Sequence, residues 1–308
     1  MTASTSTAVS AARSSHATEI ALLLLLAALW GGSYTFIKLG VETIPPVTLI
    51  AARTLIAGAI LVAVIRGRGL GLPRDLATWR LFLFQACLNS VLPFTLIAWA
   101  ERSVDAGLAT ILNATTPVFV FLLTLAFAAQ RKLDLRKAFG VAAGLAGIML
   151  VVGVEAVGGL GGELVPQLAI VLATVSYACA ALFGRNFTGL DPLMPAAGSL
   201  LCGGAILLPL ALIVDRPWTL SPSQDSILAL LALAGFSTAL AFAIYFRLIG
   251  TLGPVGTTSV SFLRVPFGVA IGIAFLGERL SPTAWLGLAL VVIGVAAMTL
   301  PERNTTTR

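Results

Sequence analysis

The fold is decided by two stretches of the chain, AGLATILNATTPVFVFLLTLAF at residues 106–127 and VGTTSVSFLRVPFGVAIGIAFL at residues 255–276. Each stretch is long and apolar enough to cross the roughly 30 Å hydrocarbon core of a bilayer as one helix. Neither stretch has the two-residue alternation of a barrel strand. Both therefore predict membrane-spanning helices.

The two stretches also align with each other. When Pro117 is set against Pro266, Gly107 falls against Gly256 at the same offset. A gap of two residues aligns the glycines of the apolar stretches that follow. These pairs are Gly140 with Gly287 and Gly147 with Gly294. An ordered set of this kind predicts an internal repeat.

The composition excludes a water-soluble fold. Of the 308 residues, 58% are hydrophobic and 10% are charged, whereas a soluble domain has about 25% charged residues. At about 20 residues for each crossing, the chain has room for about ten helices. Short polar breaks divide it into ten apolar segments, at residues 19–39, 45–65, 81–100, 106–127, 138–153, 165–184, 192–214, 226–246, 254–276 and 284–300.

We therefore predict an all-α membrane protein with ten transmembrane helices, arranged as two inverted five-helix repeats at residues 19–153 and 165–300. Because each repeat has an odd number of spans, the second repeat must enter the membrane upside down relative to the first. The tails at residues 1–18 and 301–308 then lie on the same side. With both tails in the cytoplasm, thirteen of the nineteen Lys and Arg residues fall in cytoplasmic segments and four on the opposite side, as the positive-inside rule requires.

Residue types exclude several classes of function. The net charge of +6 comes from residues spread over the loops, so no nucleic-acid partner is expected. The single histidine, His16, and the three cysteines at positions 87, 179 and 202 lack the spacing of a metal site. We predict no metal, no cofactor and no enzymatic activity, because no catalytic set of side chains lies within the spans.

Two arginines, Arg53 and Arg264, lie near the middle of their spans. A midplane arginine costs at least about 2.5 kcal/mol on insertion scales, so each must face a cavity or a partner. No Asp or Glu lies near the middle of any predicted span. The guanidinium groups are left with backbone carbonyls, water or an anionic ligand as partners, so each arginine is either a brace or a substrate contact.

The prolines at positions 93, 117 and 266 lie inside predicted spans, and each removes a helix hydrogen bond to the carbonyl four residues earlier. Two of the freed carbonyls belong to Asn89 and Asn113, and Gln85 lies one turn before Asn89 on the same helical face. These polar groups predict a cavity wall, with hydrogen bonds between helices as the alternative.

Aromatic side chains at depth predict a further part of the same wall. Trp30, Ser33 and Tyr34 share one helical face in the first span, and Tyr177 has a comparable place in the sixth. A Trp and a Tyr this deep do not belong to an interfacial belt. They line a cavity or pack in the core.

Three segments resemble the EamA-type transporters of the drug/metabolite transporter superfamily. They are WGGSYTFIKLG at 30–40, PPVTLIAARTLIAGAIL at 45–61 and PFGVAIGIAFLGERLSPTAWLGLALVVIGV at 266–295. The resemblance implies ten helices, a central cavity between the halves, and export of metabolites or amino acids across a bacterial inner membrane. It also implies a bracing role for Arg53, since the family often has arginine there. The chain departs from the family pattern at two positions. Gln130 lies where the first repeat of the family usually has a glutamate, which corresponds to Glu278 in the second repeat. Arg264 replaces a residue that is usually apolar.

The expected function is that of a secondary transporter that exports a small amino acid-like or anionic metabolite by alternating access. A channel or facilitator is the main alternative, and an intramembrane enzyme is a weaker one. The expected partners are a small-molecule substrate and the lipid bilayer. The GxxxG pairs Gly140/Gly144 and Gly268/Gly272 suit helix packing within one chain or between two chains, so the protein is expected to be a monomer or a homodimer.

Overall fold

The computed structural model describes residues 3–100, 112–127, 134–152, 164–267 and 282–300. These residues form helices joined by short connections, and no strand occurs among them. In the first half the helices are α1 (Ala3–Gly31), α2 (Ser33–Val41), α3 (Pro46–Gly67), α4 (Leu76–Ala86), the π-helix η1 (Cys87–Val91), α5 (Leu92–Ala100), α7 (Thr116–Phe127) and α8 (Leu135–Val152). In the second half they are α9 (Leu164–Phe183), the 3₁₀-helix η3 (Gly184–Phe187), α10 (Leu193–Val214), the 3₁₀-helix η4 (Pro217–Thr219), α11 (Gln224–Ala234), the π-helix η5 (Gly235–Leu240), α12 (Ala241–Thr251), α13 (Gly253–Thr258) and α15 (Pro282–Thr299).

Five helical segments are long and apolar enough to cross a membrane, at Pro46–Gly67, Leu76–Ile97, Leu164–Phe187, Leu193–Val214 and Gln224–Thr251. Shorter apolar helices occur at His16–Gly31, Thr116–Phe127 and Trp285–Thr299. The prediction of an all-α membrane protein is therefore confirmed. The count of ten spans stays a prediction, because the predicted fourth and ninth spans continue into residues 106–111 and 268–276, outside the described part of the chain.

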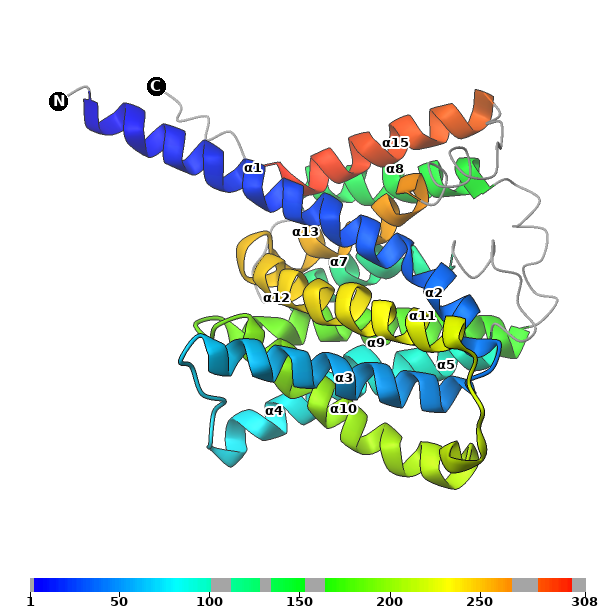
Figure 1. The fold of residues 1–308 in the computed structure, drawn as a ribbon. Coiled ribbons are helices and arrows are strands. Elements are labelled where there is room, and N and C mark those ends of the chain that lie inside the picture. Colours follow the sequence, from blue (N-terminus) through cyan, green and yellow to red (C-terminus); the bar gives the residue numbers. More distant parts are fainter. Residues whose placement is uncertain (1–2, 101–111, 128–133, 153–163, 268–281, 301–308) are drawn as a thin grey trace.

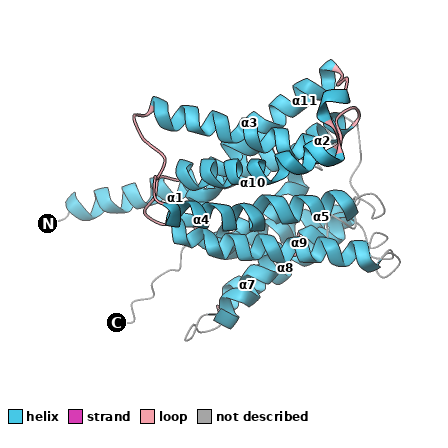
Figure 2. Cartoon of the chain, turned by 90° about the horizontal axis from the view of Figure 1, so that it is seen from below, coloured by secondary structure: helices cyan, strands magenta, loops and turns pink. Residues whose placement is uncertain are grey.

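The long helices lie side by side along one common direction (Figure 1). The start of α1, the connection from α3 to α4 and the end of α15 lie at one end of the bundle. The connections from α2 to α3 and from α10 to α11 lie at the other end, and a second view agrees (Figure 2). This arrangement gives the bundle two distinct ends.

The packing of α8 against α15 is reciprocal. A Cβ atom at Gly140 would lie 2.7 Å from the carbonyl oxygen of Gly294, and one at Gly147 would lie 2.6 Å from that of Gly287. The sequence repeat equates Gly140 with Gly287 and Gly147 with Gly294. Exchanging the two repeats therefore turns the contact between Gly140 and Gly294 into the contact between Gly287 and Gly147. This is the contact pattern of a two-fold axis.

The helices α3 and α10 repeat this pattern at a second place. A Cβ atom at Gly58 in α3 would lie 2.9 Å from Leu201, and one at Gly204 in α10 would lie 2.5 Å from Leu55. Exchanging the two halves turns one of these contacts into the other, because Gly58 corresponds to Gly204 and Leu55 corresponds to Leu201 at the same offset. The π-helices also match, because η1 interrupts the third predicted span and η5 interrupts the eighth. The two halves are therefore related by a pseudo-two-fold axis.

Some local features differ from the sequence prediction. The first helix begins at Ala3, within the predicted tail of residues 1–18, and α2 follows it after a break at Gly32. The hydroxyl of Ser33 donates to the Trp30 carbonyl over 2.7 Å there, which supports the turn where two glycines weaken the helix. A further proline, Pro209, lies inside α10.

We expect the close contact between α8 and α15 to tolerate no side chain. Gly147→Ala would bring its Cβ within 2.6 Å of the Gly287 carbonyl oxygen, so the two helices must separate at a cost of about 1–3 kcal/mol. Gly250→Ala is the matched control, because nothing lies within 4 Å of a Cβ atom at that helical position. The apparent unfolding temperature of the purified protein should fall for Gly147→Ala alone. Equal values for both variants would contradict the close packing.

Candidate functional site

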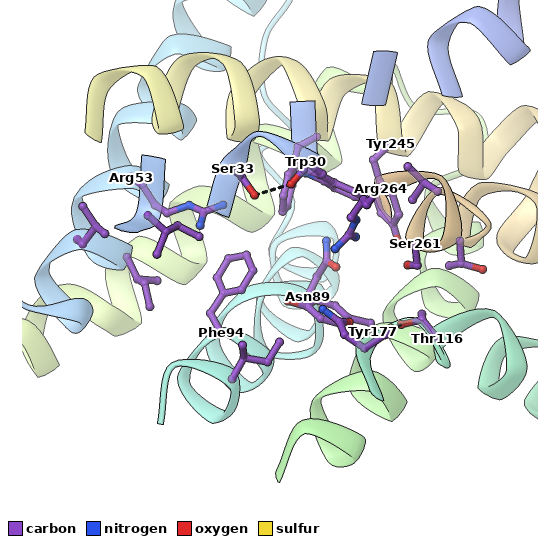
Figure 3. Close-up of a pocket in the computed structure, with 18 of the residues that line it drawn as sticks. Trp30, Ser33, Arg53, Asn89, Phe94, Thr116, Tyr177, Tyr245, Ser261 and Arg264 are labelled. Carbon is purple, nitrogen blue, oxygen red and sulfur yellow. Dashed lines mark hydrogen bonds between the residues drawn. The ribbon is translucent and has the colours of Figure 1, made fainter. Parts of the chain in front are cut away.

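A cavity of about 370 Å³ lies between the two halves. The first half contributes Trp30, Ser33, Ile37, Val41, Pro46, Leu49, Ile50, Arg53, Asn89, Phe94, Ile97, Asn113 and Thr116. The second half contributes Tyr177, Phe242, Tyr245, Thr258, Val260, Ser261 and Arg264. In the view of Figure 3, Arg53 and Arg264 enter from opposite sides. The cavity therefore has one arginine from each half.

Arg53 is tied to both halves of the protein. It projects from α3, is 5% exposed, and its Nε–H donates to the hydroxyl of Thr238 in η5 over 3.2 Å. That hydroxyl in turn donates to the Leu233 carbonyl over 2.8 Å. The guanidinium carbon lies 4.7 Å from the centre of the Phe94 ring in α5, within the range of a cation–π interaction. These contacts favour the bracing role, although the partner is a side chain rather than a backbone carbonyl.

Arg264 has fewer partners. Its guanidinium carbon lies 4.8 Å from the centre of the Trp30 ring, and among the described residues its buried Nε–H has no hydrogen-bond partner. Stacking on one face of a guanidinium leaves the N–H groups at its edge free to bind an anion.

Aromatic side chains from both halves line the cavity around the two arginines. Trp30 packs against Tyr245 at 5.7 Å between ring centres, and Phe94 packs against Tyr177 at 6.4 Å. Each pair joins one half to the other. Figure 3 shows these rings facing the same space as the arginines.

The polar groups of the cavity come from irregular parts of the helices. Asn89 lies in the π-helix η1, just before Pro93, where a wider turn takes up the missing hydrogen bond. The Asn113 carbonyl, which Pro117 cannot bind, accepts from the Thr116 hydroxyl over 2.8 Å. Irregular backbone at membrane depth is tolerated where it faces protein or a cavity.

Seven of the nine predicted site residues line the cavity. They are Trp30, Ser33, Arg53, Asn89, Asn113, Tyr177 and Arg264. Gln85 does not line it. It is fully buried, and its amide group has no partner among the described residues. Gln85 and Asn89 are both buried, but only Asn89 reaches the cavity. The side chain of Tyr34 lies outside the described part of the structure.

Sequence reasoning missed several residues of the site, notably Phe94, Thr238 and Tyr245. Tyr245 could have been found, because it is one of only three tyrosines in the chain and lies within a predicted span. Thr238 carried no signal, since its role depends on how η5 packs against α3. The departure at Gln130, its repeat mate Glu278 and the Gly268/Gly272 pair lie outside the described residues.

An ion pair that is buried on its Glu19 side and half exposed on its Arg247 side joins the two halves. Glu19 of α1 is 4% exposed and accepts from Arg247 of α12, with 2.7 Å between Nη2 and Oε1. The Thr251 hydroxyl donates to the other carboxylate oxygen over 3.0 Å. The end of α12, which carries Arg247 and Thr251, lies opposite the turn between α2 and α3, where Val41 and Pro46 line the cavity (Figure 1).

Comparisons with known proteins agree with this architecture. The model of the EamA-like transporter family matches residues 17–153 and 165–300. The chain is 30% identical over 279 residues to the uncharacterized inner membrane transporter YedA of Escherichia coli, covering 90% of this chain and 89% of that protein. It is 27% identical to an Escherichia coli protein named "Probable amino-acid metabolite efflux pump", covering 89% of this chain and 92% of that protein.

A solved crystal structure shows the same fold. It has a TM-score of 0.76 and 18% sequence identity, and the match covers 92% of this chain and 98% of that one. The relatives are named as membrane transporters and efflux pumps, which places this chain among transporters of small solutes in the membrane rather than among enzymes. With two matched repeats that span most of its length, the chain belongs to the EamA-like transporter family.

Proposed function

We propose that the protein is a secondary transporter that exports a small amino acid-like or anionic metabolite across the inner membrane by alternating access. The observation that carries this proposal is the cavity between two pseudo-symmetric halves, with one arginine from each half. Inverted repeats around a central site allow the halves to exchange conformations and so open either side.

The proposed topology has ten spans, with residues 19–153 and 165–300 as inverted repeats and both termini in the cytoplasm. Its support is the charge distribution and the two distinct ends of the bundle. The connection from α3 to α4, which carries Arg66, Arg68 and Arg74, lies at the same end as the start of α1 (Figure 1). The positive-inside rule favours the cytoplasm for that end.

The arrangement of the cavity corresponds to an outward-facing state under this topology. The lining continues to Val41 and Pro46, at the end assigned to the outside. Near the opposite end, the Glu19–Arg247 pair holds α1 against α12. Opening the cytoplasmic side would require this pair to separate.

We expect the orientation to follow the charge count. With the native cysteines replaced, single cysteines at Ser221 and Ala77, both exposed, should react with an impermeant maleimide from the outside and from the cytoplasm respectively. Reaction of the Ala77 cysteine in intact cells would reverse the topology and with it the direction of export.

Removing the ion pair should shift the protein towards the inward-facing state. A cysteine at Ser261, in the cavity wall, reports access from each side of the membrane. Glu19→Gln should raise its labelling from the cytoplasmic side about fivefold to tenfold, which corresponds to roughly 1–1.4 kcal/mol for a partly exposed pair. Labelling from the outside should fall in parallel, because the two states exclude each other.

Asp134→Asn is the matched control, since it removes the ion pair with Lys137 near the start of α8 within one half. It should leave both labelling rates unchanged. A gain from the cytoplasmic side without a loss from the outside would instead describe a channel.

The two arginines should differ in their effect on stability. Arg53→Gln removes a buried hydrogen bond worth about 0.5–1.5 kcal/mol and a cation–π contact of about 0.5–2 kcal/mol, so the yield of folded protein and its unfolding temperature should fall. Arg264→Gln loses only the stacking on Trp30, so its yield of folded protein and its unfolding temperature should fall less. An equal loss in both variants would contradict the division of roles.

A further inference from the structure

The charged side chains described in the cavity wall are all positive. Its described lining residues include two arginines and no Asp, Glu, Lys or His. Two acidic groups outside the lining are engaged elsewhere. Asp215 accepts from the backbone N–H and the hydroxyl of Thr48, at 2.8 Å and 2.9 Å, and Glu19 is paired with Arg247. Each of the two cavity arginines carries a guanidinium cation. An anionic group in the cavity would therefore meet two positive charges.

Of the two arginines, Arg264 is the one with binding capacity to spare. Arg53 uses its Nε–H on Thr238, whereas the Nε–H of Arg264 is buried and has no partner among the described residues. A buried donor without a partner is costly, and a bound carboxylate would remove that cost through a charge-assisted hydrogen bond. Trp30 holds the guanidinium in place by stacking.

The same stacking works against a positively charged ligand. An ammonium group without a carboxylate partner can bind to an aromatic face, but here Arg264 covers the Trp30 ring and Arg53 covers the Phe94 ring. Tyr245 packs against Trp30 and Phe242, and Tyr177 packs against Phe94. The rest of the lining is aliphatic or neutral and polar. An apolar body fits these walls, whereas an ammonium group would be repelled by the arginines.

We propose that the cavity binds organic anions that combine one carboxylate or similar acidic group, held by Arg264, with an apolar body and no ammonium group. This inference rests on the proposed transport function and narrows its substrate class. It separates simple organic acids from amino acids, which carry the same carboxylate but add a positive charge next to it.

Two matched series of probes test this inference. The first is 3-phenylpropionate, phenylalanine and phenethylamine, and the second is hexanoate, 2-aminohexanoate and hexylamine. Within a series the body is similar, and the probe is an anion, a zwitterion or a cation. Ligand binding raises the unfolding temperature of the purified full-length protein by mass action, so titrations of each probe give relative affinities.

We expect the acid of at least one series to bind at least about tenfold more tightly than its amino acid, which is about 1.4 kcal/mol, and the amine to give no shift. Arg264→Gln should abolish the effect of the acid. Arg264→Lys keeps the charge but loses the planar fork, so it should retain the order of the probes with about tenfold weaker binding. Arg66→Gln, the same change at an exposed arginine of α3, should leave every titration unchanged.

Three results would overturn the inference. They are equal or tighter binding of the amino acid or the amine, an acid effect that survives in Arg264→Gln, and no shift with any of the six probes at millimolar concentration. None of them decides whether the protein alternates between two states, because the labelling of the Ser261 cysteine needs no ligand. Failure of the substrate class and failure of the transport mechanism can therefore be told apart.

Discussion

Hydrocarbon offers no hydrogen-bond partner to a guanidinium or to an open backbone carbonyl, so every such group at membrane depth must be satisfied by the protein itself. The two midplane arginines and the breaks around Asn89 and Asn113 therefore lie together at one internal cavity. Regular helices surround this cavity and separate it from lipid. The cavity therefore lies where the arginines and the helix breaks come together, and the packing of the surrounding helices keeps them in place.

Packing between the helices follows from the same solvent. Lipid tails are as apolar as leucine side chains, so burying apolar surface between spans gains little, and close backbone contact becomes the main attraction. Gly140 and Gly147 in α8 provide this contact with Gly294 and Gly287 in α15. Because the contacts are reciprocal, one geometry serves both halves. A pair of halves built in this way can exchange roles with little change in the packing within each.

Contacts that cross between the halves divide into two kinds. The glycine contacts are short and involve backbone, so they resist change. The contacts around the cavity involve side chains, such as Arg53 with Thr238 and Trp30 with Tyr245, and the Glu19–Arg247 pair is half exposed on the arginine side. Side-chain contacts of this kind can separate and form again at a modest cost. A change between two states would therefore be expected to break and re-form these side-chain contacts.

The sequence by itself determined the membrane class, the helical fold and the glycine repeat, because apolar length and glycine spacing are local properties that one chain displays directly. Seven of the nine residues predicted for the site line the cavity, and they were found from the cost of polar groups and from aromatic side chains deep in the spans. Gln85 is buried but does not line the cavity, and its place depends on how the helices around it pack. Only the tertiary structure decided that Arg53 binds Thr238, that Arg264 stacks on Trp30 with a donor left over, and that Tyr245 closes the wall. These contacts depend on which faces of distant helices meet. Arg53 and Thr238 lie far apart in the chain, so the local sequence around either residue does not indicate that they are in contact.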